Sequence, residues 1–192
     1  DKALAAAEFA RLELFSLIDK FGLNRNDAKT EAVKEKPREI IKSICTSSKE
    51  LLEKIGKDEA YFYADCIDGS ICDIYFASDD EIIVMPSYCE EFSSFIKEFF
   101  ESGIKKFSYN TKELHRLAAK MGINCNNVCG DLMLSAYLLR PSDTNYDIDH
   151  MCLEYGVTVP EYQNEMGGVE QAVSFAAVLK PLFDKTNILL EE

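Results

Sequence analysis

The order of the predicted elements indicates an α/β protein with a mixed sheet, in which an antiparallel meander of three strands is flanked by helices. Three short strand patterns, 60–65, 71–77 and 81–86, follow one another with only turn residues between them. From residue 90 onward, helical and strand patterns alternate, as in proteins whose strands are joined by helices. A chain of 192 residues, 47% of them hydrophobic, suits one domain or one domain with an appended helix.

The turns of the meander are marked by their residues. Asp68-Gly69 separates the first two strands and is a hairpin signal, because these residue types tolerate left-handed backbone conformations. Asp79-Asp80 is expected to turn the chain between the second and third strands. Two such short connections leave no room for a crossover, so the three strands are predicted to be antiparallel neighbours.

A lead-in helix and an edge strand are predicted before the meander. Residues 3–21 carry apolar side chains at helical spacing, and 24–37 are polar and charged, as in a flexible linker. Residues 38–45 alternate in part and are expected to form an edge strand. Ser47-x-x-Glu50 has the pattern of a capping box and predicts a short helix. The predicted organisation is a lead-in helix over 1–23, a linker over 24–37 and a domain over 38–192.

The second half of the chain is mostly helical. Residues 90–102 carry phenylalanines at helical spacing, and this broad apolar stripe is expected to be core rather than a base-stacking surface. A short strand is predicted over 106–109. The other predicted helices are 111–121, 131–139, 147–155 and 168–190, the last with Pro181 as a possible bend.

Three runs between Phe107 and Tyr155 resemble a known family. They are Tyr109-Asn110-Thr111-Lys112, Met121-Gly122-Ile123 and Gly130-Asp131-Leu132-Met133-Leu134-Ser135-Ala136-Tyr137-Leu138-Leu139 with Pro141. This stretch resembles the middle of the 3′–5′ exonuclease domain of bacterial DNA polymerase I, and the rest of the chain resembles that domain more weakly. The resemblance implies a ribonuclease-H-like fold of the DnaQ-like exonuclease type, which the order of elements alone does not single out.

The resemblance also implies where a nuclease site would lie. Such exonucleases hold two divalent ions about 4 Å apart with carboxylates from distant parts of the chain. Of the family's positions, Asp65 is retained, whereas Ile67, Leu114 and Gln171 stand where the others carry carboxylates. We therefore expect no catalytic residues, no metal and no cofactor in this domain, with Ile67 and Leu114 partly filling the old metal site. Magnesium is expected only for the parent polymerase.

Two other interpretations remain open from the residues. An active exonuclease, directed at DNA or RNA, would need Asp65, Glu113, Asp131 and Glu170 in an unfamiliar arrangement. Asp131 lies in a run that looks like an active-site signature, but its place before a helix favours a helix cap. A third possibility is a stand-alone protein-interaction module.

The net charge of −13 argues against a DNA-binding surface on this chain. It repels a phosphate backbone, and the densest basic stretch, 29–42, is interleaved with glutamates. We expect weak DNA binding or none by this domain alone, and a polymerase domain as its intramolecular partner. No apolar run reaches the roughly 18 to 20 residues of a membrane span, so no membrane partner and a cytoplasmic location are expected.

Cysteines and histidines give no clear site in the sequence. The seven cysteines include no CxxC pair, and Cys125 and Cys129 have no histidine beside them, so reduced thiols, several of them buried, are expected. His115 follows Leu114 on a predicted helix, and His150 follows Asp149 on a predicted surface helix. Neither has an identifiable nucleophile partner.

The chain begins at Asp1 without an initiator methionine or a signal-peptide pattern, so we expect a segment of a longer protein. The resemblance implies a 5′-nuclease domain before this segment and a polymerase domain after it. The parent would then be a DNA-directed DNA polymerase, a nucleotidyltransferase of DNA replication and repair. The role expected for this segment is that of a structural scaffold.

Overall fold

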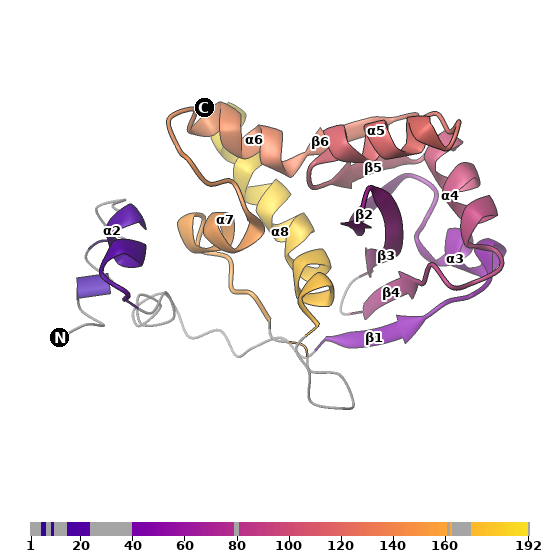
Figure 1. Ribbon diagram of the computed structural model, residues 1–192, viewed down its shortest axis with the longest axis horizontal. Helices are drawn as coiled ribbons and strands as arrows, with labels where there is room; N and C mark the ends of the chain where they lie inside the picture. The colour runs from indigo at the N-terminus through magenta and orange to yellow at the C-terminus, as the bar shows by residue number, and fades with distance from the viewer. Residues whose placement is uncertain are drawn as a thin grey trace.

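A six-stranded mixed sheet forms the centre of the protein, with helices on both faces (Figure 1). The structure is a computed structural model that describes residues 5–6, 9, 15–23, 40–78, 81–160, 162 and 170–191. Its elements are α2 (Phe15–Lys20), β1 (Ile41–Ile44), α3 (Ser48–Lys54), β2 (Glu59–Ile67), β3 (Ser70–Ser78), β4 (Glu81–Met85), α4 (Phe92–Glu101), β5 (Lys105–Ser108), α5 (Thr111–Lys120), β6 (Val128–Asp131), α6 (Leu132–Leu139), α7 (Ile148–Glu154) and α8 (Gln171–Glu191).

The sheet confirms the predicted meander and adds strands on both sides of it. Strands β2, β3 and β4 pair antiparallel in sequence order. The predicted edge strand is β1, which pairs parallel with β4. β5 and β6 extend the other side in parallel, giving the order β1-β4-β3-β2-β5-β6. Asp68 and Gly69 both have positive φ at the β2–β3 turn, as predicted, whereas the Asp79-Asp80 turn lies outside the described residues.

β6 is a strand that the sequence analysis missed. It has only four residues and no alternating pattern, so its pairing with β5 is set by tertiary structure. Gly130 within it lies against two rings: a Cβ at this position would come 2.6 Å from Phe107 and 2.8 Å from Phe183. The glycine is thus required by close packing rather than by a turn.

Alternation along β2 divides the core into two layers. Phe62 belongs to the cluster that α3, α4 and α5 cover, together with the phenylalanines of α4. Tyr61 and Tyr63 point to the opposite face, where they contact Phe183 and Phe175 of α8. The α4 stripe is buried, as predicted: Phe92, Phe95, Phe99 and Phe100 are each less than a tenth exposed.

One buried lysine holds the start of β5. Lys106 is fully buried, and its Nζ donates to the carbonyl oxygens of Ile104, Asn126 and Ser102 at 2.8, 3.0 and 3.1 Å. Burial lowers the pKa of Lys106 to about 8. These three backbone carbonyls thereby gain a hydrogen-bond donor. Because they lie just after α4 and just before β5 and β6, Lys106 connects these three elements.

The helix termini depart from the sequence analysis at one place. The helix after Ser47 forms as predicted, but the Ser47 side chain makes no capping hydrogen bond. Instead, Glu91 at the start of α4 accepts from the Ser48 amide at 2.6 Å. A capping box needs both reciprocal bonds, and here a residue from another element provides the acceptor. The capping-box prediction was therefore wrong, although the helix itself was predicted correctly.

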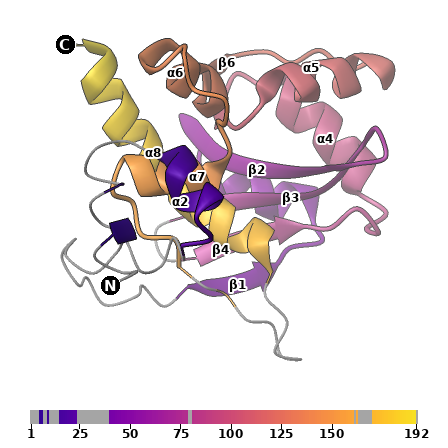
Figure 2. The ribbon, with the colours of Figure 1, turned by 60° about the vertical axis from the view of Figure 1, so that its left-hand side comes forward.

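The long C-terminal helix α8 crosses the face of the sheet opposite α4, as the two views show (Figures 1 and 2). It spans 21 residues with Pro181 inside it, close to the predicted range. The proposed linker, 24–37, and about half of the predicted lead-in segment, 1–23, lie outside the described residues, whereas Phe15–Lys20 of that segment form the helix α2. Of the helices that the structure describes, none is both long enough and apolar enough to cross a membrane.

Candidate functional site

Asp65 is the candidate carboxylate nearest the centre of the sheet. It lies near the end of β2 on the face that α8 covers, where the Tyr75 hydroxyl donates to its Oδ2 at 3.4 Å. The β2–β3 register shifts between Ala64 and Cys66, so Asp65 sits at an irregular pairing. Burial is the main cause that raises the pKa of the Asp65 carboxyl, and the charges of Asp73 and Glu170 raise it further.

Ile67 and Leu114 do not fill a common site beside Asp65. Ile67 is 56% exposed at the end of β2, whereas Leu114 is 3% exposed. Leu114 belongs to the cluster on the α4 face, whereas the Tyr75 ring that contacts Asp65 belongs to the cluster on the α8 face. The expectation that the two apolar residues jointly fill an old metal site was therefore wrong, because they lie in different environments.

Gln171 and its neighbour Glu170 have different partners. Gln171 is exposed, and its amide donates to Asp149 of α7 at 3.2 Å. Glu170, one residue earlier, is one of two carboxylates, after Asp73, whose charge raises the pKa of the Asp65 carboxyl. One helical residue corresponds to about 100° of rotation, so neighbouring residues face different elements. The carboxyl of Asp65 on β2 thus feels the charges of Asp73 on β3 and of Glu170, the residue before α8.

Glu170 forms an ion pair with a lysine of the edge strand. Lys42 of β1 donates to both of its carboxylate oxygens, at 2.5 and 2.7 Å. The two side chains are only 19% and 22% exposed, so this ion pair is less screened than one at the surface. A pair 128 residues apart in sequence joins the edge strand to the start of α8. No pattern in the sequence predicts it.

Asp131 is a structural residue, as the sequence analysis favoured. Its side chain caps α6 by accepting from the amides of Met133 and Leu134. It also accepts from the amides of Asn110 and Thr111 at 3.1 and 2.8 Å, where α5 begins. One carboxylate therefore caps two helices.

Glu113 likewise has a partner outside the candidate site. Arg116, one turn along α5, forms a bidentate ion pair with it on the surface. This hydrogen bond lowers the pKa of Glu113. Of the four carboxylates that an active exonuclease would use, none shares a group of three possible metal ligands with the others, among the residues that the structure describes.

The histidines have different environments. His115 is exposed on α5, consistent with a surface residue. His150 is only 6% exposed, so its prediction as part of a surface helix was wrong: α7 turns this side toward the protein. The structure brings His150 together with Asp143 and Glu154, a group that the sequence analysis did not anticipate.

All seven cysteines are free, and Cys45 and Cys152 are buried, which agrees with the expected reduced thiols.

The mixed sheet, with its antiparallel meander and α8 across one face, defines a ribonuclease-H-like exonuclease fold. The family model of the DNA polymerase I ribonuclease H-like domain matches residues 57–168, and the chain belongs to this family. No curated protein matches the sequence significantly.

Two solved structures have the same fold. The POL domain of Pol1 from M. smegmatis, in complex with DNA primer-template and dNTP, is 17% identical with a TM-score of 0.59. The match covers 75% of this chain and 26% of that chain, so the protein spans about a quarter of Pol1. NrnC from Brucella melitensis with bound Mg²⁺ is 12% identical with a TM-score of 0.57, over 79% of this chain and 81% of that chain.

Proposed function

We propose that this chain is the exonuclease-like domain of a DNA polymerase I, that it has lost hydrolytic activity, and that it serves the polymerase as a scaffold. One observation carries the proposal: each candidate carboxylate has a separate partner. Asp65 accepts from Tyr75, Glu170 from Lys42 and Asp131 from two helix N-termini. We infer that no two-metal centre can assemble without breaking these contacts.

The chemistry of hydrolysis supports this inference. Two-metal hydrolysis needs carboxylate oxygens on both sides of two ions about 4 Å apart. Asp65 and Glu170 are the two that lie in one region, but the Lys42 ammonium already neutralises Glu170. A divalent ion would have to displace this ammonium and then find further ligands, while the family's remaining positions hold an exposed Ile67 and a buried Leu114.

The family membership supports a role for the parent protein. A DNA polymerase I transfers nucleotides to a primer 3′ end, with magnesium, in DNA replication and repair. We propose that this chain belongs to such a bacterial, cytoplasmic nucleotidyltransferase and meets DNA only through it. The net charge of −13 supports weak binding of DNA by the chain alone.

An active exonuclease remains the second candidate. The charge of Glu170 raises the pKa of the Asp65 carboxyl, which supports keeping these two carboxylates as a candidate pair. NrnC, which shares the fold, has been solved with bound Mg²⁺. This candidate requires that metal binding release Glu170 from Lys42, and it predicts shortening of a DNA or RNA strand that depends on both carboxylates.

An apolar surface on α6 and the end of α8 supports the scaffold role. Leu134, Tyr137 and Leu138 of α6 are 54%, 49% and 58% exposed. The last turns of α8 add Ile188, Leu189 and Leu190, which are 60%, 43% and 41% exposed. The end of α8 lies on the same side of the molecule as α6 in both views (Figures 1 and 2). Exposed apolar side chains on two helices that lie on the same side are typical of an interface, and we assign them to contact with the polymerase domain.

Glutamate substitutions on this surface test the scaffold role. In the full-length protein, Leu134→Glu with Leu138→Glu is expected to loosen the contact between domains, because it puts charges into an apolar interface. The measurement is the rate of limited proteolysis between this domain and the polymerase domain. Ile67→Glu is the matched control, since Ile67 is equally exposed but lies on β2 rather than on α6 or α8. Equal proteolysis of the double variant and this control would contradict the assignment.

A further inference from the structure

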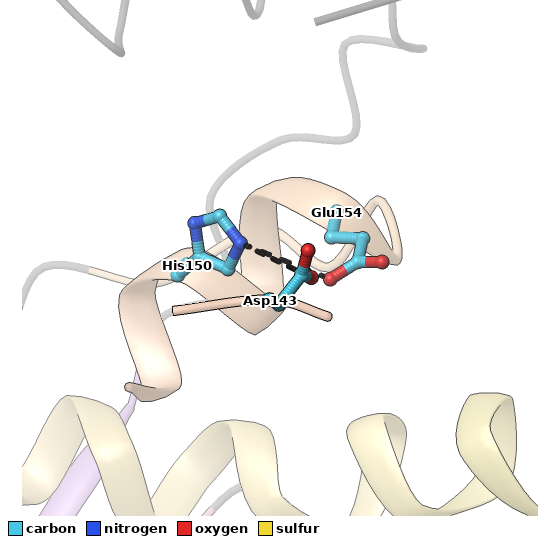
Figure 3. Close-up of side chains that lie close together, drawn as sticks. All are labelled: Asp143, His150 and Glu154. Atoms are coloured by element: carbon cyan, nitrogen blue, oxygen red, sulfur yellow. Dashed lines mark ion pairs between the residues drawn. The ribbon is translucent and has the colours of Figure 1, made fainter. Parts of the chain in front are cut away.

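Three potential metal ligands come together between α6 and α7 (Figure 3). His150 Nε2 lies 4.0 Å from Asp143 Oδ2 and 3.9 Å from Glu154 Oε2. The three ligand atoms all lie within 4.8 Å of one another. We propose that Asp143, His150 and Glu154 bind one divalent transition-metal ion of the Zn²⁺ class. This site is separate from the region of Asp65, and the inference does not rest on the proposed function.

The separations suit one ion. Two of the three separations are 3.9 and 4.0 Å, and all three ligand atoms lie within 4.8 Å of one another. Ligands at the roughly 2.0 to 2.2 Å of zinc bonds lie about 3.3 to 3.6 Å apart around a tetrahedral ion, so the side chains close on the ion by up to about 1.5 Å. Glu154 and His150 are one helical turn apart on α7, so their side chains lie on one face of the helix.

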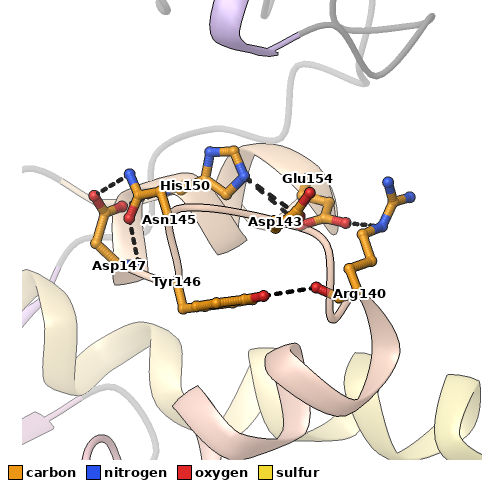
Figure 4. Close-up of polar contacts among 7 residues, drawn as sticks. All are labelled: Arg140, Asp143, Asn145, Tyr146, Asp147, His150 and Glu154. Atoms are coloured by element: carbon orange, nitrogen blue, oxygen red, sulfur yellow. Dashed lines mark hydrogen bonds and ion pairs between the residues drawn. The ribbon is translucent and has the colours of Figure 1, made fainter.

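The charges of the site favour a cation. The side chains of His150 and Glu154 are 8% and 5% exposed, and Asp143 is 29% exposed. Among the described residues, the site holds two carboxylates, and Arg140 Nε pairs with one of them at Glu154 Oε1 (Figure 4). The other oxygen of that carboxylate, Oε2, lies 3.9 Å from His150 Nε2. Arg140 thus orients the ligating carboxylate, as outer-shell partners of metal sites commonly do.

The loop before α7 is fixed by hydrogen bonds that do not use the ligand atoms (Figure 4). The Tyr146 hydroxyl donates to the Arg140 carbonyl at 2.7 Å. Asp147 caps α7 by accepting from the His150 amide at 2.6 Å, and Asn145 Nδ2 donates to Asp147 at 2.6 Å. These bonds order the backbone between Arg140 and His150, which lowers the entropy cost of binding an ion.

The ligand set selects the class of ion. One imidazole nitrogen with two carboxylate oxygens suits zinc, whereas magnesium and calcium favour sites built of oxygen alone. Three protein ligands leave a position for water, and Asp143 is the ligand nearest solvent, so an ion can enter from its side. Cys152 is buried in the apolar cluster under α7 and does not belong to the ligand group.

Because the sequence holds only two histidines, imidazole NMR reports the site directly. Zn²⁺ is titrated at neutral pH into the full chain in which the exposed Cys66 and Cys129 are serine, so that surface thiols do not compete. The ring signals of His150 are expected to shift while those of His115 stay in place. Zinc is also expected to raise the melting temperature, because it binds the folded state. Mg²⁺ at the same concentration is expected to do neither.

Variants of each ligand complete the test. Asp143→Asn and Glu154→Gln are expected to weaken zinc binding by at least about tenfold, and His115→Asn to leave it unchanged. Asp143→Asn is the variant least expected to disturb folding, because Asp143 lies on the loop and its side chain is partly exposed to solvent. Zinc affinity that is equal in the parent and in Asp143→Asn would overturn the proposal. So would equal shifts of both histidines, or an equal response to Mg²⁺.

Discussion

Leu114→Asp is expected to lower the free energy of unfolding by about 4 to 5 kcal/mol, whereas Ile67→Glu is expected to change it by less than about 0.5 kcal/mol. Both substitutions introduce a carboxyl at a position where the resemblance leads us to expect one in the family's active exonucleases. Leu114 is buried in the α4-face cluster, so a carboxyl there loses its hydration without gaining a partner. Ile67 is exposed, so a glutamate there stays in water.

Urea unfolding measures the free energy of unfolding of both variants, with Leu114→Ala as the matched control. The comparison separates the cost of burying a charge from the cost of leaving a cavity. The alanine variant loses about 2 to 5 kcal/mol through the cavity alone. Burial raises the pKa of the new carboxyl above its unfolded value of about 3.9, so the charge penalty is absent below about pH 4 and grows as the pH rises. An aspartate variant as stable as Ile67→Glu at neutral pH would show that Leu114 is not in the core.

Asp131→Ala is expected to lower the free energy of unfolding by about 2 to 4 kcal/mol. The Asp131 carboxylate caps α6 and also accepts from the amides of Asn110 and Thr111 and from the Thr111 hydroxyl at 2.8 Å. Each lost helix cap costs about 0.5 to 2 kcal/mol, and the removed charge also faced the positive ends of two helix dipoles.

Asp147→Ala is the matched control for this loss. Asp147 caps only one helix, α7, through the amide of His150, so its removal is expected to cost about 1 kcal/mol. Chemical denaturation of both variants gives the comparison. If the two substitutions cost the same, the double capping by Asp131 does not contribute to stability, and a functional role for this carboxylate regains weight.

Local patterns made the fold largely predictable. The meander follows from three strand patterns and the Asp68-Gly69 turn, and the α4 stripe follows from helical spacing. The cap at Asp131 follows from an aspartate placed before an apolar helix. Each of these signals lies within a few residues of the structure that it determines, so a single sequence is sufficient to read it.

The environment of the candidate site depended on contacts between distant residues. A leucine and an isoleucine look alike in sequence, yet Leu114 is buried and Ile67 exposed. The Lys42–Glu170 pair joins the two ends of the described domain, while its neighbour Gln171 donates to Asp149 of α7 instead. The metal-ligand group near His150 likewise arises only when the loop folds back on α7.

Hydrolysis of a 3′-labelled single strand of DNA, in magnesium and then in manganese, tests the central claim most directly. The parent chain, Asp65→Ala and Glu170→Gln are compared after identical purification. The account predicts no shortening by the parent above the level of the two variants, because Asp65 and Glu170 are tied to Tyr75 and Lys42. Shortening by the parent that persists through further purification and disappears in both variants would contradict it and establish an active exonuclease.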